Sequence, residues 1–277
     1  TPERIFMDIE QMTFANQSIN RVTAIAKQAD DNWQINLNAQ EARATIKLFN
    51  DWLGNGIDIQ ADYINFSEWN SAPNPQEHTS DNRLLANSLQ PHTLPPIALT
   101  CTQCRILDNN IGEIVLRTKP TANGMRIEQF STQNDHGGIT LTGDWLQLDS
   151  GLSETYVDGQ LVSDDFGAFL KEFNFTTGIK DSEAQFAFDL IWEKAPFDFA
   201  FTTVDGNVDW SLSDGYITEI SDKGSRIFTL LSLDSLVRKL SLDFRDVFAK
   251  GFFYDKINGT MEILNGIADT QDTVVDG

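Results

Sequence analysis

The chain has 277 residues, of which 40% are hydrophobic and 10% aromatic, and its formal net charge is −21. This composition excludes a disordered chain, because enough apolar side chains are present to form a substantial core. The acidic balance argues against binding to nucleic acid and against docking flat on an anionic membrane, because both of these surfaces are negatively charged.

The first 69 residues predict a β-rich part. Alternating apolar side chains favour strands over residues 5–9, 21–26 and 33–37. Residues 40–53 fit a helix, but the apolar side chains at every second position from Ala42 to Leu48 fit a strand equally well. A linker or long loop follows over residues 70–96, which have little periodicity and contain Pro73, Pro75, Pro91, Pro95 and Pro96. Residues 97–277 then form the C-terminal part.

The two cysteines, Cys101 and Cys104, lie inside an alternating stretch that begins at residue 97. A zinc site needs about four ligands, and a thioredoxin-like site needs this spacing at the start of a helix, so neither site is favoured. The favoured interpretation is a pair of strand residues, with or without a disulfide. Positions three apart in a regular strand face opposite sides, so a disulfide between them would require a turn or a bulge.

A strongly aromatic β-hairpin is predicted after residue 183. Every even position from 184 to 192 is apolar, and the alternation resumes after Pro196 over residues 197–201. A third strand is expected over residues 208–212, between turn signals at Asp205-Gly206 and Asp214-Gly215. Similar openings at residues 158 and 258 indicate loosely repeated strand units. The predicted apolar face of these strands consists of Phe186, Phe188, Leu190, Trp192, Phe197, Phe199, Phe201, Val208, Trp210 and Leu212.

Two short amphipathic helices interrupt the strand pattern. Apolar residues at helical spacing, preceded by Asp164 and Asp165, predict a helix over residues 164–173. A clearer helix is predicted over residues 225–240, with Ser225 as its N-cap and cations in its last turn. Its expected apolar face consists of Ile227, Leu230, Leu231, Leu233, Leu236, Val237 and Leu240.

No constellation of catalytic residues is visible. His78, His92 and His136 lie in loop-like contexts, and no nucleophile elbow, phosphate-binding loop or metalloprotease motif occurs. Carboxylate pairs such as Asp164-Asp165 and Asp243/Asp246 are common in an acidic chain and are interpreted as helix starts or solvated turns. The sequence therefore predicts a protein that is not an enzyme and that has no metal or cofactor.

The aromatic strand face has two interpretations that sequence alone does not separate. It is either the core of a closed sandwich or the inside of an open apolar trough. The shortage of covering helices favours the trough, because a large exposed apolar face marks a ligand or membrane site. A carbohydrate-binding face built from Trp residues and paired acids ranks last, because the Phe-rich face has few polar partners for sugars.

The ends of the chain indicate a piece of a longer protein. It begins at Thr1 without a signal peptide and stops at Gly277 without a capped element. No run approaches the ~20 apolar residues of a membrane-spanning helix. Any targeting signal or anchor is therefore expected outside this stretch.

The C-terminal third contains a long pattern, GSRIFTLLSL at residues 224–233 and RKLSLDFRDVFAKGF at residues 238–252. Together with residues 204–208, 253–259, 94–97, 111–114 and 143–145, it resembles the YhdP type of the AsmA-like family. The resemblance is strong over residues 94–265 and faint over residues 1–69, and the family pattern does not contain the cysteine pair.

The resemblance implies a periplasmic part of a bridge-like lipid-transfer protein. Its fold would be mainly β, a long twisted antiparallel sheet curved into an open groove or half-barrel, with two short helices. Its ligands would be phospholipid acyl chains that move between the inner and outer membranes of Gram-negative bacteria, and the parent protein would be anchored in the inner membrane. Envelope proteins are further expected partners. The alternative function is a non-catalytic envelope scaffold that binds another protein through a sheet edge.

Overall fold

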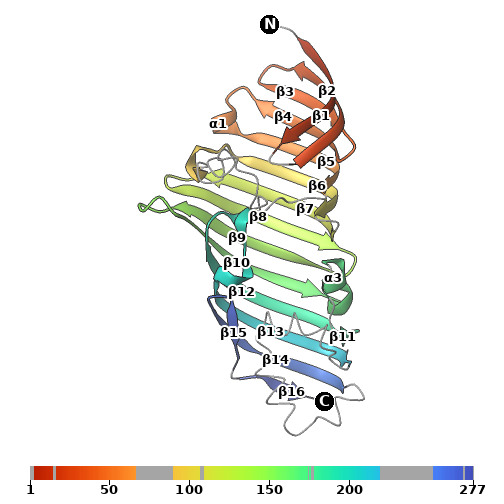
Figure 1. Cartoon of the computed structure of the whole chain (residues 1–277), viewed down its shortest axis with the longest axis vertical. Helices are drawn as coiled ribbons and strands as arrows, with labels where there is room; N and C mark the ends of the chain where they lie inside the picture. Colours follow the sequence, from red (N-terminus) through yellow and green to blue (C-terminus); the bar gives the residue numbers. More distant parts are fainter. Residues whose placement is uncertain are drawn as a thin grey trace, which may run out of the picture. The chain divides into compact units, whose positions relative to one another are not determined.

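The computed structural model describes residues 3–14, 17–66, 90–106, 109–173, 175, 178–218, 252–270 and 272–276 (Figure 1). The chain divides into two compact units. The first comprises residues 1–132 with 144–151, and the second comprises residues 133–143 with 152–277. The boundary at residues 70–96 stays a prediction, and residues 67–89 lie outside the part that the structure describes.

The first unit is built from strands that follow one another in space as they do in the sequence (Figure 1). Strands β1 to β5 pair antiparallel with their sequence neighbours, as do β6 and β7. The strands predicted over residues 5–9, 21–26 and 33–37 are confirmed as β1, β2 and β3. The strands are β1 (Arg4–Phe14), β2 (Gln17–Gln28), β3 (Asn32–Asn38), β4 (Ala42–Phe49), β5 (Ile57–Phe66), β6 (Ile97–Ile106), β7 (Asn109–Pro120) and β8 (Gly124–Asn134).

The ambiguous segment of residues 40–53 is a strand for most of its length. Ala42 and Ala44 in β4 are buried while Arg43 and Thr45 are exposed, which is the two-residue period of a half-buried strand. The helix α1 (Trp52–Asn55) has only four residues and follows Asp51, whose side chain accepts a hydrogen bond from the Gly54 amide. The pairing of β4 with β3 and β5 therefore decided between the helix and the strand that the sequence pattern allowed.

One pair of strands departs from the expected antiparallel arrangement. Strands β5 and β6 are parallel, with Ile57 opposite Ile97 and Phe66 opposite Ile106. Parallel neighbours need a crossover of a dozen or more residues, and the long connection over residues 67–96 supplies it. The described end of that connection contains a short 3-10 helix, η1 (Pro91–Thr93).

The second unit contains the strand order β9-β10-β12-β13-β14-β15, while β11 pairs with β13 and β16 pairs with β14 (Figure 1). Most of β9 belongs to this unit, and its last residues belong to the first. The mainly β architecture expected from the sequence is confirmed. The strands are β9 (Gly137–Gln147), β10 (Ser153–Ser163), β11 (Ile179–Lys180), β12 (Glu183–Glu193), β13 (Val204–Ile217), β14 (Phe252–Leu264), β15 (Ile267–Asp269) and β16 (Val274–Asp276).

The predicted strand over residues 197–201 is wrong. The chain there forms two 3-10 helices, η2 (Pro196–Asp198) and η3 (Phe201–Thr203), and the hairpin partner of β12 is β13. Proline lacks an amide hydrogen and fixes φ, so the chain turns at Pro196. Hydrogen bonds within the segment replace hydrogen bonds to a neighbouring strand, because the Trp192 indole N–H and the Asp198 amide both donate to the Ala195 carbonyl.

The helix predicted over residues 164–173 is confirmed as α3 (Phe166–Glu172), which lies beside the ends of β10 and β12 (Figure 1). The Asp165 carboxylate accepts a hydrogen bond of 2.9 Å from the Ala168 amide, which is the N-cap interaction expected of an acid at this position. Phe166 and Phe169 are buried. The helix predicted over residues 225–240, with its whole apolar face, lies outside the described residues.

Candidate functional site

Four strands of the second unit bring apolar side chains onto one face. The register aligns Leu161, Phe186, Trp210 and Gly259 in one row across β10, β12, β13 and β14. Directly opposite residues of antiparallel strands share a face, so neighbouring rows extend the same surface. We call this surface the apolar face, and it consists of Val157, Leu161, Ala184, Phe186, Phe188, Leu190, Val208, Trp210, Leu212, Ile257, Met261 and Ile263.

Glycines alternate with large side chains within this face. Gly159 lies opposite Phe188, Gly206 lies opposite Leu190, and Gly259 lies opposite Trp210. A Cβ on Gly159 would approach Cζ of Phe188 to 2.8 Å, so the missing side chain makes room for the ring. Sheets commonly use glycines in this way beside aromatic residues.

The opposite face of the same strands is polar. Its rows align Asp158 with Asp189, Asn207 and Glu262, and align Ala187 with Asp209. Ala187, Asn207, Asp209 and Glu262 are all exposed. One side of this sheet therefore presents acids and amides while the other presents aliphatic and aromatic groups.

Helix α3 covers one end of the apolar face. The rings of Phe166 and Phe186 lie 5.1 Å apart, and Phe166 and Phe169 belong to the same buried cluster as Ala184 and Leu212. Along β12, however, Phe186, Phe188 and Leu190 are only partly buried. Within the described residues, the apolar face is therefore shielded from solvent near α3 and only partly shielded over the centre of β12.

A shallow hollow of ≈ 400 Å³ lies over the four central strands. Three consecutive residues from each strand contribute to it, and the hollow opens on the polar face, because the residues on either side of the central row point that way. These are Gln160, Val162, Gln185, Ala187, Asp209, Ser211, Asn258 and Thr260. Asp272, which accepts hydrogen bonds from the amide and the hydroxyl of Thr260, also lines it. Its lining mixes apolar groups with amides, hydroxyls and two carboxylates. The volume lies within the range of small-molecule sites.

The structure divides the sequence-predicted face residues into three groups. Phe186, Phe188, Leu190, Val208, Trp210 and Leu212 lie together on the apolar face. Trp192 is buried one row further along, opposite Thr155 and Val204.

The three phenylalanines beyond Pro196 belong to the 3-10 segment instead of a strand. Phe197 is 42% exposed and Phe199 is 41% exposed. The Phe199 ring packs edge-on against Trp192, with 5.2 Å between ring centroids, and Phe201 begins η3. These residues flank the end of β12 and do not extend the sheet face.

Several members of the apolar face were missed by sequence reasoning. Val157 and Leu161 come from β10, while Ile257, Met261 and Ile263 come from β14. Their alternation was visible, but the glycines at 159 and 259 were interpreted as turns that open strand units. Both glycines lie inside strands.

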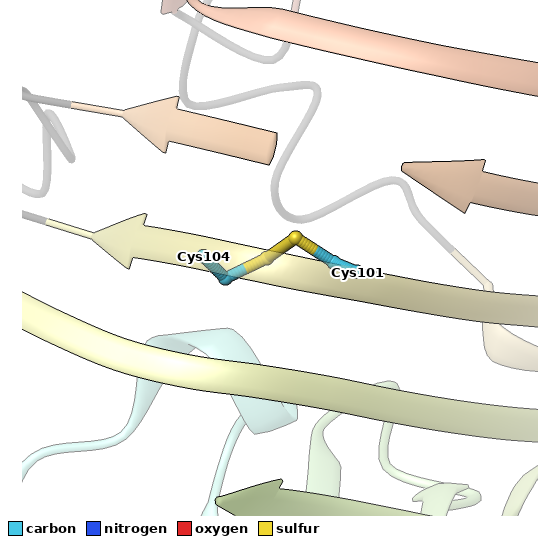
Figure 2. The surroundings of a disulfide bond; sticks show 2 residues. All are labelled: Cys101 and Cys104. Atoms are coloured by element: carbon cyan, nitrogen blue, oxygen red, sulfur yellow. A yellow bond between two sulfur atoms is a disulfide. The ribbon is translucent and has the colours of Figure 1, made fainter. Parts of the chain in front are cut away.

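The cysteines form a disulfide in the first unit. Cys101 and Cys104 are joined along β6, as Figure 2 shows, and their side chains are 0% and 2% exposed. The register between β6 and β7 shifts between these residues and again after Cys104. This irregularity is the bulge that a disulfide between positions three apart requires. The pair packs against Ala44, Ala61 and Ile114.

Replacing both cysteines with alanine is expected to lower the free energy of unfolding by about 2 kcal/mol, because the bond constrains the unfolded chain even when the loop is short. Urea unfolding of the oxidised chain and of the Cys101→Ala/Cys104→Ala variant measures this difference. Adding a reductant should bring the original chain to the midpoint of the variant. Equal midpoints for the oxidised chain and the variant would contradict the prediction.

A buried polar network lies near the start of β12. The Tyr254 hydroxyl donates to Oγ of Ser182 at 2.8 Å, and the single hydroxyl proton of Ser182 is shared between the carbonyls of Glu183 and Ser213. Desolvation raises the pKa of the Tyr254 phenol, an effect that the bond to Ser182 partly offsets. The phenol stays neutral at neutral pH and joins the β11–β12 turn to β13 and β14.

The described part of the chain contains no group of three or more His, Cys, Asp or Glu side chains placed to hold a metal ion. Among the same residues, no helix has the length and apolar character needed to cross a membrane. The described strands of the second unit present an apolar surface on one face and a hollow lined largely by polar side chains on the other.

Comparison with known proteins gives two matches over the whole chain. The model of the family described as YhdP protein matches residues 1–277. The chain is also 28% identical over 283 residues to a protein of Escherichia coli (strain K12) described as "Intermembrane phospholipid transporter YhdP". That alignment covers 100% of this chain but 22% of the relative, so the chain spans about a fifth of the relative's length. No solved structure matches.

Proposed function

The chain belongs to the YhdP family, and from that membership we propose that it is a segment of a protein that transports phospholipids between membranes. Its own part in that transport is to bind acyl chains on the apolar face. Two observations support the proposal: the E. coli relative is described as a phospholipid transporter, and the sheet of this chain has an apolar face.

The observation that carries the proposal is the partly open apolar face. Phe186, Phe188 and Leu190 remain accessible in a row along β12, beside the buried Val208 and Trp210. An acyl chain that enters such a surface leaves water and gains about 0.8 kcal/mol for each buried CH₂ group. The polar opposite face keeps this part of the chain hydrated on its other side.

The proposed compartment is the periplasm, with the parent protein anchored in the inner membrane. The disulfide between Cys101 and Cys104 supports an oxidising compartment, because cytosolic proteins rarely keep structural disulfides. The proposed role is non-catalytic, and the proposed path is a groove along the sheet in which headgroups stay in water.

Native mass spectrometry of the chain purified from a lipid-containing host tests the proposal. We expect phospholipid to co-purify with the folded chain, and lipid-free chain to take up phospholipid from vesicles. A folded chain that carries no lipid in either experiment would overturn the proposal and favour the envelope scaffold.

A further inference from the structure

We infer that Phe197 and Phe199 form the entrance at which an acyl chain first contacts the second unit and from which it moves onto the apolar face. The inference deepens the proposed function and rests on it. It assigns a role to the two phenylalanines that the sequence pattern placed on the sheet face and that the structure places beyond its end.

The other end of the apolar face is closed by helix α3. Phe166 and Phe169 are 6% and 2% exposed, and both belong to the buried cluster that contains Ala184 at the start of β12. The helix is also held by a backbone hydrogen bond of 2.8 Å from the Phe166 amide to the Ser182 carbonyl. An acyl chain that entered here would have to displace a packed helix.

The Trp192 end of β12 exposes aromatic side chains instead. Phe197 and Phe199 are each about two-fifths exposed, and they lie one residue apart in the segment that follows Pro196. Exposed rings cost free energy in water, and apolar groups that gather at the surface commonly mark a contact site. The two ends of the face therefore differ, because one is packed and the other presents rings to solvent.

Apolar contacts lead without a break from this exposed segment to the centre of the face. The Phe199 ring packs edge-on against Trp192 at 5.2 Å. Trp192 belongs to a buried cluster against which Phe188 and Leu190 pack. An acyl chain that follows these side chains stays in contact with apolar groups from the surface to the partly open row along β12.

The backbone that carries the two rings lies outside the sheet ladder. The pairing of β12 with β13 ends at Trp192 and Val204. Between these residues, the amides of Asp198 and Thr203 donate to the Ala195 and Ala200 carbonyls. The rings of Phe197 and Phe199 can therefore turn aside for a ligand while every pair of the β12–β13 ladder stays formed.

Entry at the end of the face needs less exposed hydrocarbon than entry from above. A chain that approaches the open centre sideways must hold its whole length in water before it makes contact. A chain that slides in from the end transfers one CH₂ group after another, and each buried group contributes about 0.8 kcal/mol. An apolar contact at the end of β12 should therefore govern the rate of loading more than the amount of lipid bound.

The test measures the rate of loading. Lipid-free chain is mixed with phosphatidylcholine vesicles that contain a phosphatidylcholine with a pyrene-labelled acyl chain, and the loss of excimer fluorescence reports uptake. These vesicles have no net charge, so an added carboxylate does not alter their attraction to the chain. We expect Phe197→Asp and Phe199→Asp each to lower the initial rate about fourfold, the effect of losing apolar contact with one CH₂ group on entry.

The matched control is an exposed phenylalanine at the other end of the strands. Phe253 is 76% exposed and lies opposite Tyr216, near the end of β13 that is distant from Val204. Phe253→Asp should load at the rate of the original chain. Urea unfolding shows which variants are folded, and native mass spectrometry should find final lipid loading close to that of the original chain in each.

The outcomes separate the entrance from the proposed function. If the original chain takes up no lipid, both fail. If it loads, but a folded Phe197→Asp or Phe199→Asp variant loads at the original rate, only the entrance is overturned. A Phe253→Asp variant that loads as slowly as these two would overturn it as well, because the effect would not depend on the end of β12.

Discussion

Phe188→Asp is expected to remove bound phospholipid from the folded chain, with a fall of roughly tenfold or more in lipid per chain. Phe188 lies in the middle of the apolar face, opposite Gly159 on β10 and Val208 on β13. A carboxylate there keeps water on the face and would have to be desolvated by any acyl chain that lies across it. A tenfold fall corresponds to about 1.4 kcal/mol, which is a small part of that cost.

The matched control is the next residue along the strand. Ala187 is exposed on the polar face, opposite Asp209, so Ala187→Asp adds the same charge to the other side of β12. This variant should retain its lipid. Circular dichroism and urea unfolding must show that both variants fold, and lipid is measured by native mass spectrometry. Equal lipid loading in the two variants would contradict the proposal that the apolar face binds the lipid.

Phe199→Asp separates the sheet face from the aromatic segment that follows it. Phe199 lies beyond Pro196 and packs on Trp192 at the end of β12. Because this position is outside the sheet, its effect on lipid loading should be smaller than that of Phe188→Asp. A larger loss would shift the proposed binding surface toward residues 196–203.

Gly206→Ala is expected to lower the free energy of unfolding by about 3 kcal/mol or more. Gly206 lies inside β13 with φ of 144°, a conformation that residues with a side chain rarely adopt. A Cβ at this position would also clash with the backbone oxygen of Asp189 on β12. Relief of that clash requires β12 and β13 to separate at the position where they are paired.

Gly151→Ala is the control that measures the cost of the backbone conformation without a steric clash. Gly151 has φ of 84°, but no heavy atom lies within 4 Å of the Cβ that alanine would add. The loss should therefore be about 1 kcal/mol, the cost of the left-handed conformation without a steric clash. Urea unfolding of the two variants measures the difference, and similar losses would refute the steric argument.

The local sequence was sufficient to predict the main elements. The alternation over residues 184–192 and 208–212 placed Phe186, Phe188 and Trp210 on one side of their strands, and the register between β12 and β13 aligns them. Side-chain direction reverses at each residue of a strand, so a periodic sequence determines a face without reference to any partner. Asp165 likewise indicated the start of α3, because an N-cap acts within one helical turn.

Elements with two local solutions depended on their neighbours. Residues 40–53 fitted both periods until β3 and β5 paired with β4. The glycine pairs at 158–159, 205–206 and 258–259 indicated turns, yet all three lie inside strands. Glycine is suited both to a turn and to a strand position where an aromatic side chain approaches the backbone closely. Only the packing across the sheet distinguishes these two roles.

The sequence by itself determined the mainly β class, the apolar side of β12 and β13, the helix after Asp165 and the resemblance to a lipid-transport family. Tertiary structure alone decided the parallel pairing of β5 with β6 and the bulge that lets Cys101 and Cys104 join. The first group follows from side-chain periods and capping within a few residues. The second depends on contacts between residues distant in the sequence, and no local pattern encodes those contacts.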